Sequence, residues 1–103
     1  MKANAGIVEL FSEAEIAARV QVLGREVADD IGPDILLIAV LKGSFVFTAD
    51  LMRALHRAEV RPQVDFMQLS SYGSGTQSKG RVEVVRDVGD PIEGRTVLLV
   101  DDI

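Results

Sequence analysis

Two adjacent carboxylates at the end of an apolar run are the clearest sign of chemistry in this chain. Asp101 and Asp102 directly follow Val97-Leu98-Leu99-Val100. Four consecutive apolar residues predict a parallel strand buried on both faces, and such strands carry functional groups at their carboxyl ends. Ionised carboxylates only accept hydrogen bonds, so this pair suits sugar hydroxyls or a hard divalent cation. Aspartate is a poor strand former, and the alternative is a solvated strand end.

A second candidate is the turn Lys42-Gly43-Ser44, which lies between an apolar run and a predicted helix. Amides at the start of a helix, together with the Lys42 ammonium, could hold a phosphate group. The alternative is a tight strand-to-helix turn with a solvated lysine, because three residues make a motif of low specificity.

The third candidate is the segment Ser70 to Gly80, which reads S-S-Y-G-S-G-T-Q-S-K-G. Its glycines and serines cannot form a core, so we expect a long mobile loop. Ser71 and Tyr72 could close over a ligand, excluding water and adding hydroxyl donors and an aromatic face. The alternative is a disordered surface hairpin, and the aromatic ring of Tyr72 favours the lid.

The elements that must position these residues follow from hydrophobic spacing. Ser12 and Glu15 form the S-x-x-E pattern of a capping box, and the apolar residues that follow at helical spacing predict a helix over 13 to 30. Gly32-Pro33 ends this helix. The remaining predicted elements are a buried strand Ile35–Leu41, a helix Phe45–Arg57, a hairpin of strands Val64–Leu69 and Arg81–Arg86, a turn Asp87–Gly94 and a last strand Thr96–Val100. Their order predicts an α/β sheet with right-handed crossovers.

Within the second predicted helix, the apolar residues are expected in the core. They are Phe45, Phe47, Leu51 and Leu55. His56 lies late in the same helix beside an arginine, so we expect a surface position near the helix end and no catalytic role.

Composition limits the classes of function. The chain has 103 residues, 48% of them hydrophobic, which suits one small domain that is incomplete as an open α/β sheet. A net charge of -5 argues against a nucleic-acid partner. The absence of cysteine excludes disulfides and thiolate chemistry and is compatible with a reducing cytoplasm. Glutamates interrupt any signal-peptide pattern, and no apolar run approaches the ~20 residues of a membrane helix, so we expect a non-secreted protein without a membrane partner.

Three segments in order resemble the hypoxanthine phosphoribosyltransferases, the 6-oxopurine branch of the type I phosphoribosyltransferases. They are I-A-V-L-K-G-S-F (38–45), V-D-F-M-Q-L-S-S-Y-G-S-G-T (64–76) and D-P-I-E-G-R-T-V-L-L-V-D-D-I (90–103). The resemblance implies a purine-salvage transferase that moves ribose 5-phosphate from phosphoribosyl diphosphate to hypoxanthine or guanine, giving IMP or GMP and diphosphate. It also implies Mg²⁺, a cytoplasmic location, and a Rossmann-like core with a mainly parallel sheet and a flexible antiparallel hairpin. Residues 1–103 are then the N-terminal part of a single domain.

The resemblance also implies roles for the candidate residues. Lys42 and Gly43 resemble the family's diphosphate-binding loop, in which a cis peptide here lies between Leu41 and Lys42. Ser71 and Tyr72 resemble the flexible catalytic loop that shields an oxocarbenium-like transition state from water. Asp101 and Asp102 resemble the acidic pair that meets the ribose hydroxyls and Mg²⁺, although the first of these positions is often Glu in the family.

Other parts of the family's site lie beyond Ile103. They include a further aspartate near the purine, the 5-phosphate loop and the base-recognition residues, so we expect no catalysis by this chain alone. The family implies a homodimer or homotetramer for the full-length protein, while the preferred purine cannot be read here. Two alternatives stay open. One is a response-regulator receiver, although V-L-L-V-D-D begins that domain and ends this chain; the other is a shortened, non-catalytic relative that acts as a ligand-binding or regulatory module.

Overall fold

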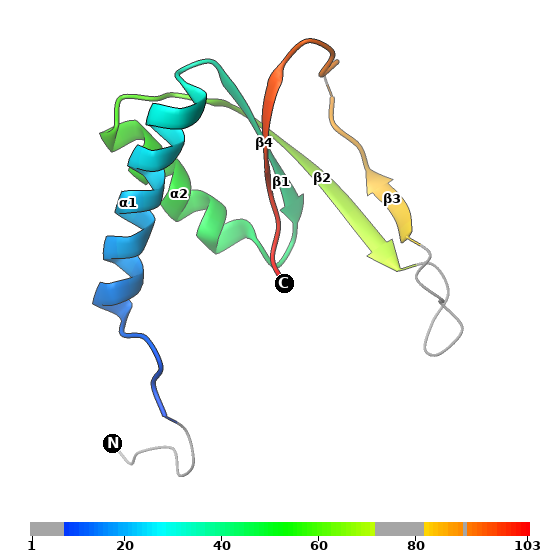
Figure 1. Ribbon diagram of the computed structural model, residues 1–103. Coiled ribbons are helices and arrows are strands. Elements are labelled where there is room, and N and C mark those ends of the chain that lie inside the picture. The colour runs from blue at the N-terminus through cyan, green and yellow to red at the C-terminus, as the bar shows by residue number, and fades with distance from the viewer. Residues whose placement is uncertain (1–7, 72–81, 90) are drawn as a thin grey trace.

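The computed structural model of the chain describes residues 8–71, 82–89 and 91–103. The elements, in order, are α1 (Glu13–Ile31), β1 (Ile35–Leu41), α2 (Phe45–Arg57), β2 (Gln63–Ser71), β3 (Val82–Arg86) and β4 (Thr96–Val100), as Figure 1 shows. The bounds predicted for β1, α2 and β4 are confirmed. Strand β2 is longer than predicted and takes in two residues that were expected to belong to the loop.

The four strands form one sheet in the order β3-β2-β1-β4. Strand β1 is parallel to both of its neighbours, and β2 and β3 form the antiparallel hairpin. Helices α1 and α2 pack on the same side of this sheet (Figure 1). The predicted fold class, a mainly parallel α/β sheet with one antiparallel hairpin, is therefore confirmed.

Helix α1 begins at the residue that the sequence predicts and ends at Ile31, one residue later than predicted. The Ser12 hydroxyl accepts from the Glu15 amide at 3.0 Å, and the Glu15 carboxylate accepts from the Ser12 amide at 2.8 Å. The backbone hydrogen bond from Ser12, and then its hydroxyl, lower the pKa of Glu15 because both stabilise the carboxylate. At the other end Gly32 has a φ of 94°, which favours glycine, and its amide donates to the Ala28 carbonyl at 3.1 Å.

Strand β1 is the centre of the core, since every residue from Ile35 to Val40 is buried. Side chains of α1, α2 and β4 pack with it, and the buried cluster comprises Val27, Ile35, Leu37, Ala39, Leu51, Leu55, Val60 and Val100. A strand between two parallel neighbours is expected to read as a continuous apolar run, as this one does.

The prediction that β4 is buried on both faces is wrong. Val100 is 5% exposed, whereas Leu99 is 62% exposed. Successive side chains of a strand point to opposite faces, and only one face of β4 packs against the helices in the part of the chain that the structure describes. Among the described strands β4 also pairs only with β1, so it lacks the second neighbour that β1 has.

The core prediction for α2 is half right. Leu51 and Leu55 are buried, but Phe45 and Phe47 are 62% and 39% exposed. Both phenylalanines lie in the first turn of the helix, before Thr48, its first buried residue. His56 is exposed near the helix end, as expected. Neither described helix is long and apolar enough to cross a lipid bilayer.

The two helices meet closely at Gly24. A Cβ atom placed on Gly24 would lie 2.8 Å from the Ala54 Cβ and 3.0 Å from its carbonyl carbon. We expect Gly24→Ala to lower the free energy of unfolding by about 1–3 kcal/mol through overpacking, despite the gain in helix propensity of about 1 kcal/mol. Urea denaturation measures this difference. Adding Ala54→Gly should cost less than the sum of the single changes, and a Gly24→Ala variant more stable than the parent would contradict the close contact.

A buried hydroxyl in α2 gives a second prediction. Thr48 is 2% exposed, and its Oγ1 has no hydrogen-bond partner among the described residues. Thr48→Val keeps the shape of the side chain and removes the unpaired polar group, so we expect it to raise the free energy of unfolding by about 1 kcal/mol. Thr48→Ala, which also loses a methyl group, is the control and should not be stabilising. Equal destabilisation by both changes in thermal unfolding would show that the hydroxyl contributes to stability.

Candidate functional site

The parallel pairing of β1 with β4 sets the place of the candidate site. Ala39 lies opposite Val100 in this pair, so the residues that follow the two strands emerge at the same edge of the sheet. In Figure 1 the end of the chain lies beside the turn between β1 and α2. The sequence placed Lys42 and Gly43 in this turn and Asp101 and Asp102 after β4, and the structure brings the two groups together.

Gly43 and Asp102 make the closest approach within this site. A Cβ atom placed on Gly43 would collide with the Asp102 carboxylate, and its distance from the Asp102 Cγ would be 2.8 Å. Any side chain at position 43 would therefore displace the carboxylate. Glycine at this position leaves room for the Asp102 carboxylate, and no unusual backbone angle calls for it.

The turn after β1 is held by its own hydrogen bonds. The Leu41 to Lys42 peptide bond is cis, as the family resemblance implied, and the Phe45 amide donates to the Lys42 carbonyl at 3.1 Å. The buried Ser44 hydroxyl donates to the Val40 carbonyl at 2.6 Å. Ser44 is the N-cap of α2, yet its side chain does not cap the helix. The Ser44 hydroxyl therefore accepts no hydrogen bond from the first-turn amides of α2. Lys42, which is exposed, lies two residues before this N-cap in the sequence.

The acidic pair is exposed to solvent. The Asp101 Oδ1 accepts from the Asp102 amide at 2.8 Å, which fixes one carboxylate next to the other residue's backbone. The described part of the chain contains no group of three or more His, Cys, Asp or Glu side chains arranged to hold a metal. Two carboxylates fit Mg²⁺ that is bound mainly by substrate phosphates and water, because Mg²⁺ commonly uses one or two protein carboxylates in such sites.

The third predicted group lies partly outside the described residues. Ser71 is the last residue of β2 and pairs with Val82 of β3. Strand β2 is parallel to β1, so its last residue, Ser71, lies toward the edge of the sheet at which β1 also ends. Strand β1 lies between β2 and β4, so Ser71 is not on a strand next to β4. Tyr72 lies outside the described residues.

Asp65 is a site-supporting residue that the sequence analysis missed. Its Oδ2 accepts from the Gly89 amide and its Oδ1 from the Phe66 amide, both at 2.7 Å. The Gln63 Oε1 also accepts from Arg95 Nη1 at 3.1 Å. These bonds tie β2 to the connection that leads into β4. The available signal was an aspartate inside a predicted strand, where the residue type is disfavoured.

Comparison with known proteins finds a family whose members resemble this chain over most of its length. The phosphoribosyl transferase domain family matches residues 9–103. The chain is 41% identical over 96 residues to a hypoxanthine-guanine phosphoribosyltransferase of Dictyostelium discoideum, covering 91% of this chain and 53% of that protein. It is 43% identical over 97 residues to a hypoxanthine phosphoribosyltransferase of Escherichia coli K12, and this match also covers 91% of this chain and 53% of that protein. The chain therefore spans about half the length of these relatives.

Solved structures agree with this family. A Trypanosoma cruzi hypoxanthine phosphoribosyltransferase complexed with IMP matches 98% of this chain and 56% of its own at 38% identity, with a TM-score of 0.80. The hypoxanthine-guanine phosphoribosyltransferase of L. donovani matches 92% of this chain and 55% of its own at 36% identity, with a TM-score of 0.78. The chain is thus similar to the same part of several such transferases in both sequence and fold.

The contact between Gly43 and Asp102 can be tested without any ligand. Gly43→Ala should move the Asp102 carboxylate and change the Asp101 and Asp102 amide resonances in an NMR spectrum. We expect a small change in melting temperature, because an exposed carboxylate at the end of a strand can shift cheaply. Gly89→Ala is the matched control, since its Cβ would lie 3.7 Å from Asp65 Oδ2, an ordinary contact distance. Unchanged Asp102 resonances in Gly43→Ala would show that the two loops are further apart.

Proposed function

Because this chain belongs to the phosphoribosyl transferase domain family, matched over residues 9–103, we propose that it supplies the diphosphate- and ribose-binding part of a purine-salvage transferase. The reaction transfers ribose 5-phosphate from phosphoribosyl diphosphate to hypoxanthine or guanine and yields IMP or GMP and diphosphate. Residues 1–103 form the N-terminal part of a single domain in this proposal. The relatives' names support a 6-oxopurine as the base that accepts the ribose 5-phosphate, and the T. cruzi relative was solved with IMP.

The observation that carries the proposal is the convergence of Gly43 with Asp102 at one edge of the sheet. Lys42 and the amides around Gly43 bind the diphosphate, because an ammonium and exposed amides both favour an anion. Asp101 and Asp102 accept hydrogen bonds from the ribose hydroxyls and contribute to Mg²⁺ binding. The metal, when bound, neutralises charge on the departing diphosphate.

Ser71 and Tyr72 are assigned to shielding the reacting carbon from water. Support comes from the direction of β2, which runs parallel to β1 and ends at Ser71 after passing the last residue of the β1 register. Water exclusion matters because an oxocarbenium-like centre is hydrolysed if water reaches it. The full-length protein is proposed to act in the cytoplasm as a homodimer or homotetramer, as the family resemblance implies.

Binding by the chain itself is the first test. We expect phosphoribosyl diphosphate with Mg²⁺ to bind in calorimetry and Asp102→Asn to weaken binding by about tenfold to a hundredfold, because a charge-assisted hydrogen bond is lost. Asp50→Asn is the matched control, since Asp50 is an exposed aspartate on α2. We also expect no IMP from the chain alone. An absence of binding contradicts the assigned residues, and IMP formation contradicts the expectation that more of the domain is needed.

A chimera separates the transferase from the non-catalytic alternative. Residues 9–103 would replace the matching half of the E. coli relative, which is 43% identical. The proposal expects IMP formation by the chimera and a lower kcat after Asp102→Asn. A folded chimera that binds phosphoribosyl diphosphate but forms no IMP would favour a ligand-binding or regulatory relative.

A further inference from the structure

One carboxylate outside the candidate site holds the segment through which the chain reaches the acidic pair. Asp65 is half-buried in β2, and its two oxygens accept hydrogen bonds at 2.7 Å from the amides of Phe66 and Gly89. Phe66 is the next residue along β2, whereas Gly89 belongs to the connection between β3 and β4. The bond to Gly89 therefore ties two separate segments together, and the proposed function gives it no role.

The Asp65 carboxylate binds the connection just beyond the point where the pairing of β2 with β3 ends. In this antiparallel pair Gln68 lies opposite Arg86, the last residue of β3. Because opposed residues of an antiparallel pair run in contrary directions along the two chains, the same register continued would put Gly89 opposite Asp65. The Gly89 amide is bound there by a side chain, so the connection stays beside β2 beyond the end of β3.

The connection then leads to β4, which lies on the side of β1 away from β2 (Figure 1). Directly before β4 begins, Arg95 Nη1 donates to the Gln63 Oε1 at 3.1 Å, and Gln63 is the first residue of β2. Strand β2 thus holds the connection at two points. The Asp65 bond ends on a backbone amide and fixes the chain itself, whereas the Gln63 bond reaches the chain through the long side chain of Arg95.

Strand β4 depends on such support more than β1 does. It has five residues and, among the described strands, pairs with β1 alone. Its Leu99 side chain is 62% exposed, so packing holds only part of the strand. Asp101 and Asp102 directly follow β4, and any displacement of the strand moves both carboxylates.

We propose that Asp65 is a positioning residue for the acidic pair. By holding the Gly89 amide it keeps the connection in place and β4 closed against β1, and so sets where Asp101 and Asp102 meet the ribose and Mg²⁺. Asp65 touches no substrate in this proposal and acts through β4. The proposal rests on the proposed function for the identity of the ligand, but its effect on the position of the two aspartates can be measured without one.

Amide hydrogen exchange tests the positioning in the free chain. Asp65→Asn keeps the shape of the side chain and replaces one of its two acceptor oxygens by a donor group. We expect the amides of β4 to exchange about tenfold faster, because one lost hydrogen bond changes a local opening equilibrium by up to that factor. The Asp101 and Asp102 amide resonances should shift, while the amides of α2 keep their exchange rates. An equal change in β4 and α2 would show that Asp65 only stabilises the fold, and would overturn the proposal.

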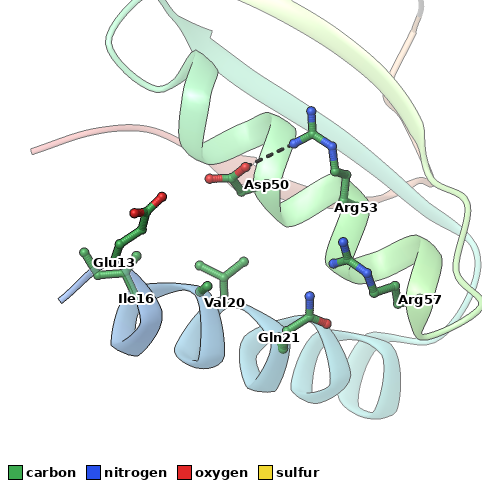
Figure 2. Close-up of a pocket in the computed structure, with 8 residues that line it drawn as sticks. Glu13, Ile16, Val20, Gln21, Asp50, Arg53 and Arg57 are labelled. Carbon is green, nitrogen blue, oxygen red and sulfur yellow. Dashed lines mark hydrogen bonds and ion pairs between the residues drawn. The ribbon is translucent and has the colours of Figure 1, made fainter. Parts of the chain in front are cut away.

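Asp50→Asn is the matched control. The Asp50 Oδ1 also accepts a hydrogen bond, from Arg53 Nη1 at 3.1 Å, but Figure 2 shows both residues on α2, away from the connection. This variant should leave the exchange of the β4 amides unchanged.

A second pair of variants changes the donor instead of the carboxylate. Gly89 is exposed, and Gly89→Pro removes the amide that Asp65 binds. It should speed exchange in β4 as Asp65→Asn does, and it gives the same test where Asp65→Asn does not fold. Gly89→Ala keeps the amide and should have no such effect. Unchanged exchange in β4 of Gly89→Pro would contradict the proposal.

Calorimetry with phosphoribosyl diphosphate and Mg²⁺ then links Asp65 to the acidic pair. Asp65→Asn should weaken binding by about threefold to tenfold in the parent chain. In the Asp102→Asn background the further loss should be smaller, about twofold, because Asp65 acts through the acidic pair. Equal losses in the two backgrounds would overturn the proposal. If the parent chain does not bind this ligand, the proposed function fails, and hydrogen exchange still decides whether Asp65 positions Asp101 and Asp102.

Discussion

The pairing of β1 with β4 is the constraint on which the candidate site depends. It fixes where both strands end, and the opposition of Ala39 and Val100 leaves little room between the turns that follow. Gly43 occupies the point of closest approach to Asp102. The position of the turn that contains Lys42 and Gly43 next to the residues that follow β4 is thus a consequence of register in the sheet.

Both strands are held at more than one place. Strand β1 is buried along its length, and the Ser44 hydroxyl ties the start of α2 back to the Val40 carbonyl. Strand β4 has fewer packed side chains, but the Asp65 carboxylate and the Gln63 amide hold the connection that precedes it. The edge residues of β4 are therefore positioned by hydrogen bonds at the far end of the strand as well as by packing.

The sequence predicts the elements better than it predicts their surroundings. The bounds of β1 and α2 follow from a continuous apolar run and a glycine turn, and the capping box of Ser12 and Glu15 marks the start of α1. The exposure of Leu99 depends on how many strands and helices lie beside β4, which no local pattern encodes. The same holds for Phe45, which is apolar and at helical spacing but is exposed in the first turn of α2.

In the candidate site, too, the local pattern predicts the residues but not what lies next to them. Lys42, Gly43 and the two aspartates were predicted from residue type at strand ends, because parallel strands place such residues at one edge. The close approach of Gly43 to Asp102 was not predicted, since it depends on the register of strands that are distant in sequence. Asp65 stood out only as an aspartate inside a predicted strand, and its partner could not be predicted because the Gly89 amide is a backbone group that any residue carries.

Electrostatics favour a metal complex over a bare anion as the ligand proposed for this edge. The candidate site contains one ammonium, at Lys42, and two carboxylates, at Asp101 and Asp102, in a chain whose net charge is -5. A diphosphate approaching alone meets more negative than positive charge, and like charges repel at short distance. A divalent cation between the diphosphate and the carboxylates offsets this repulsion, because both anionic groups are then attracted to the cation. The acidic pair is therefore unfavourable for the anion by itself and favourable for its magnesium complex, which is the form of ligand in the proposed reaction.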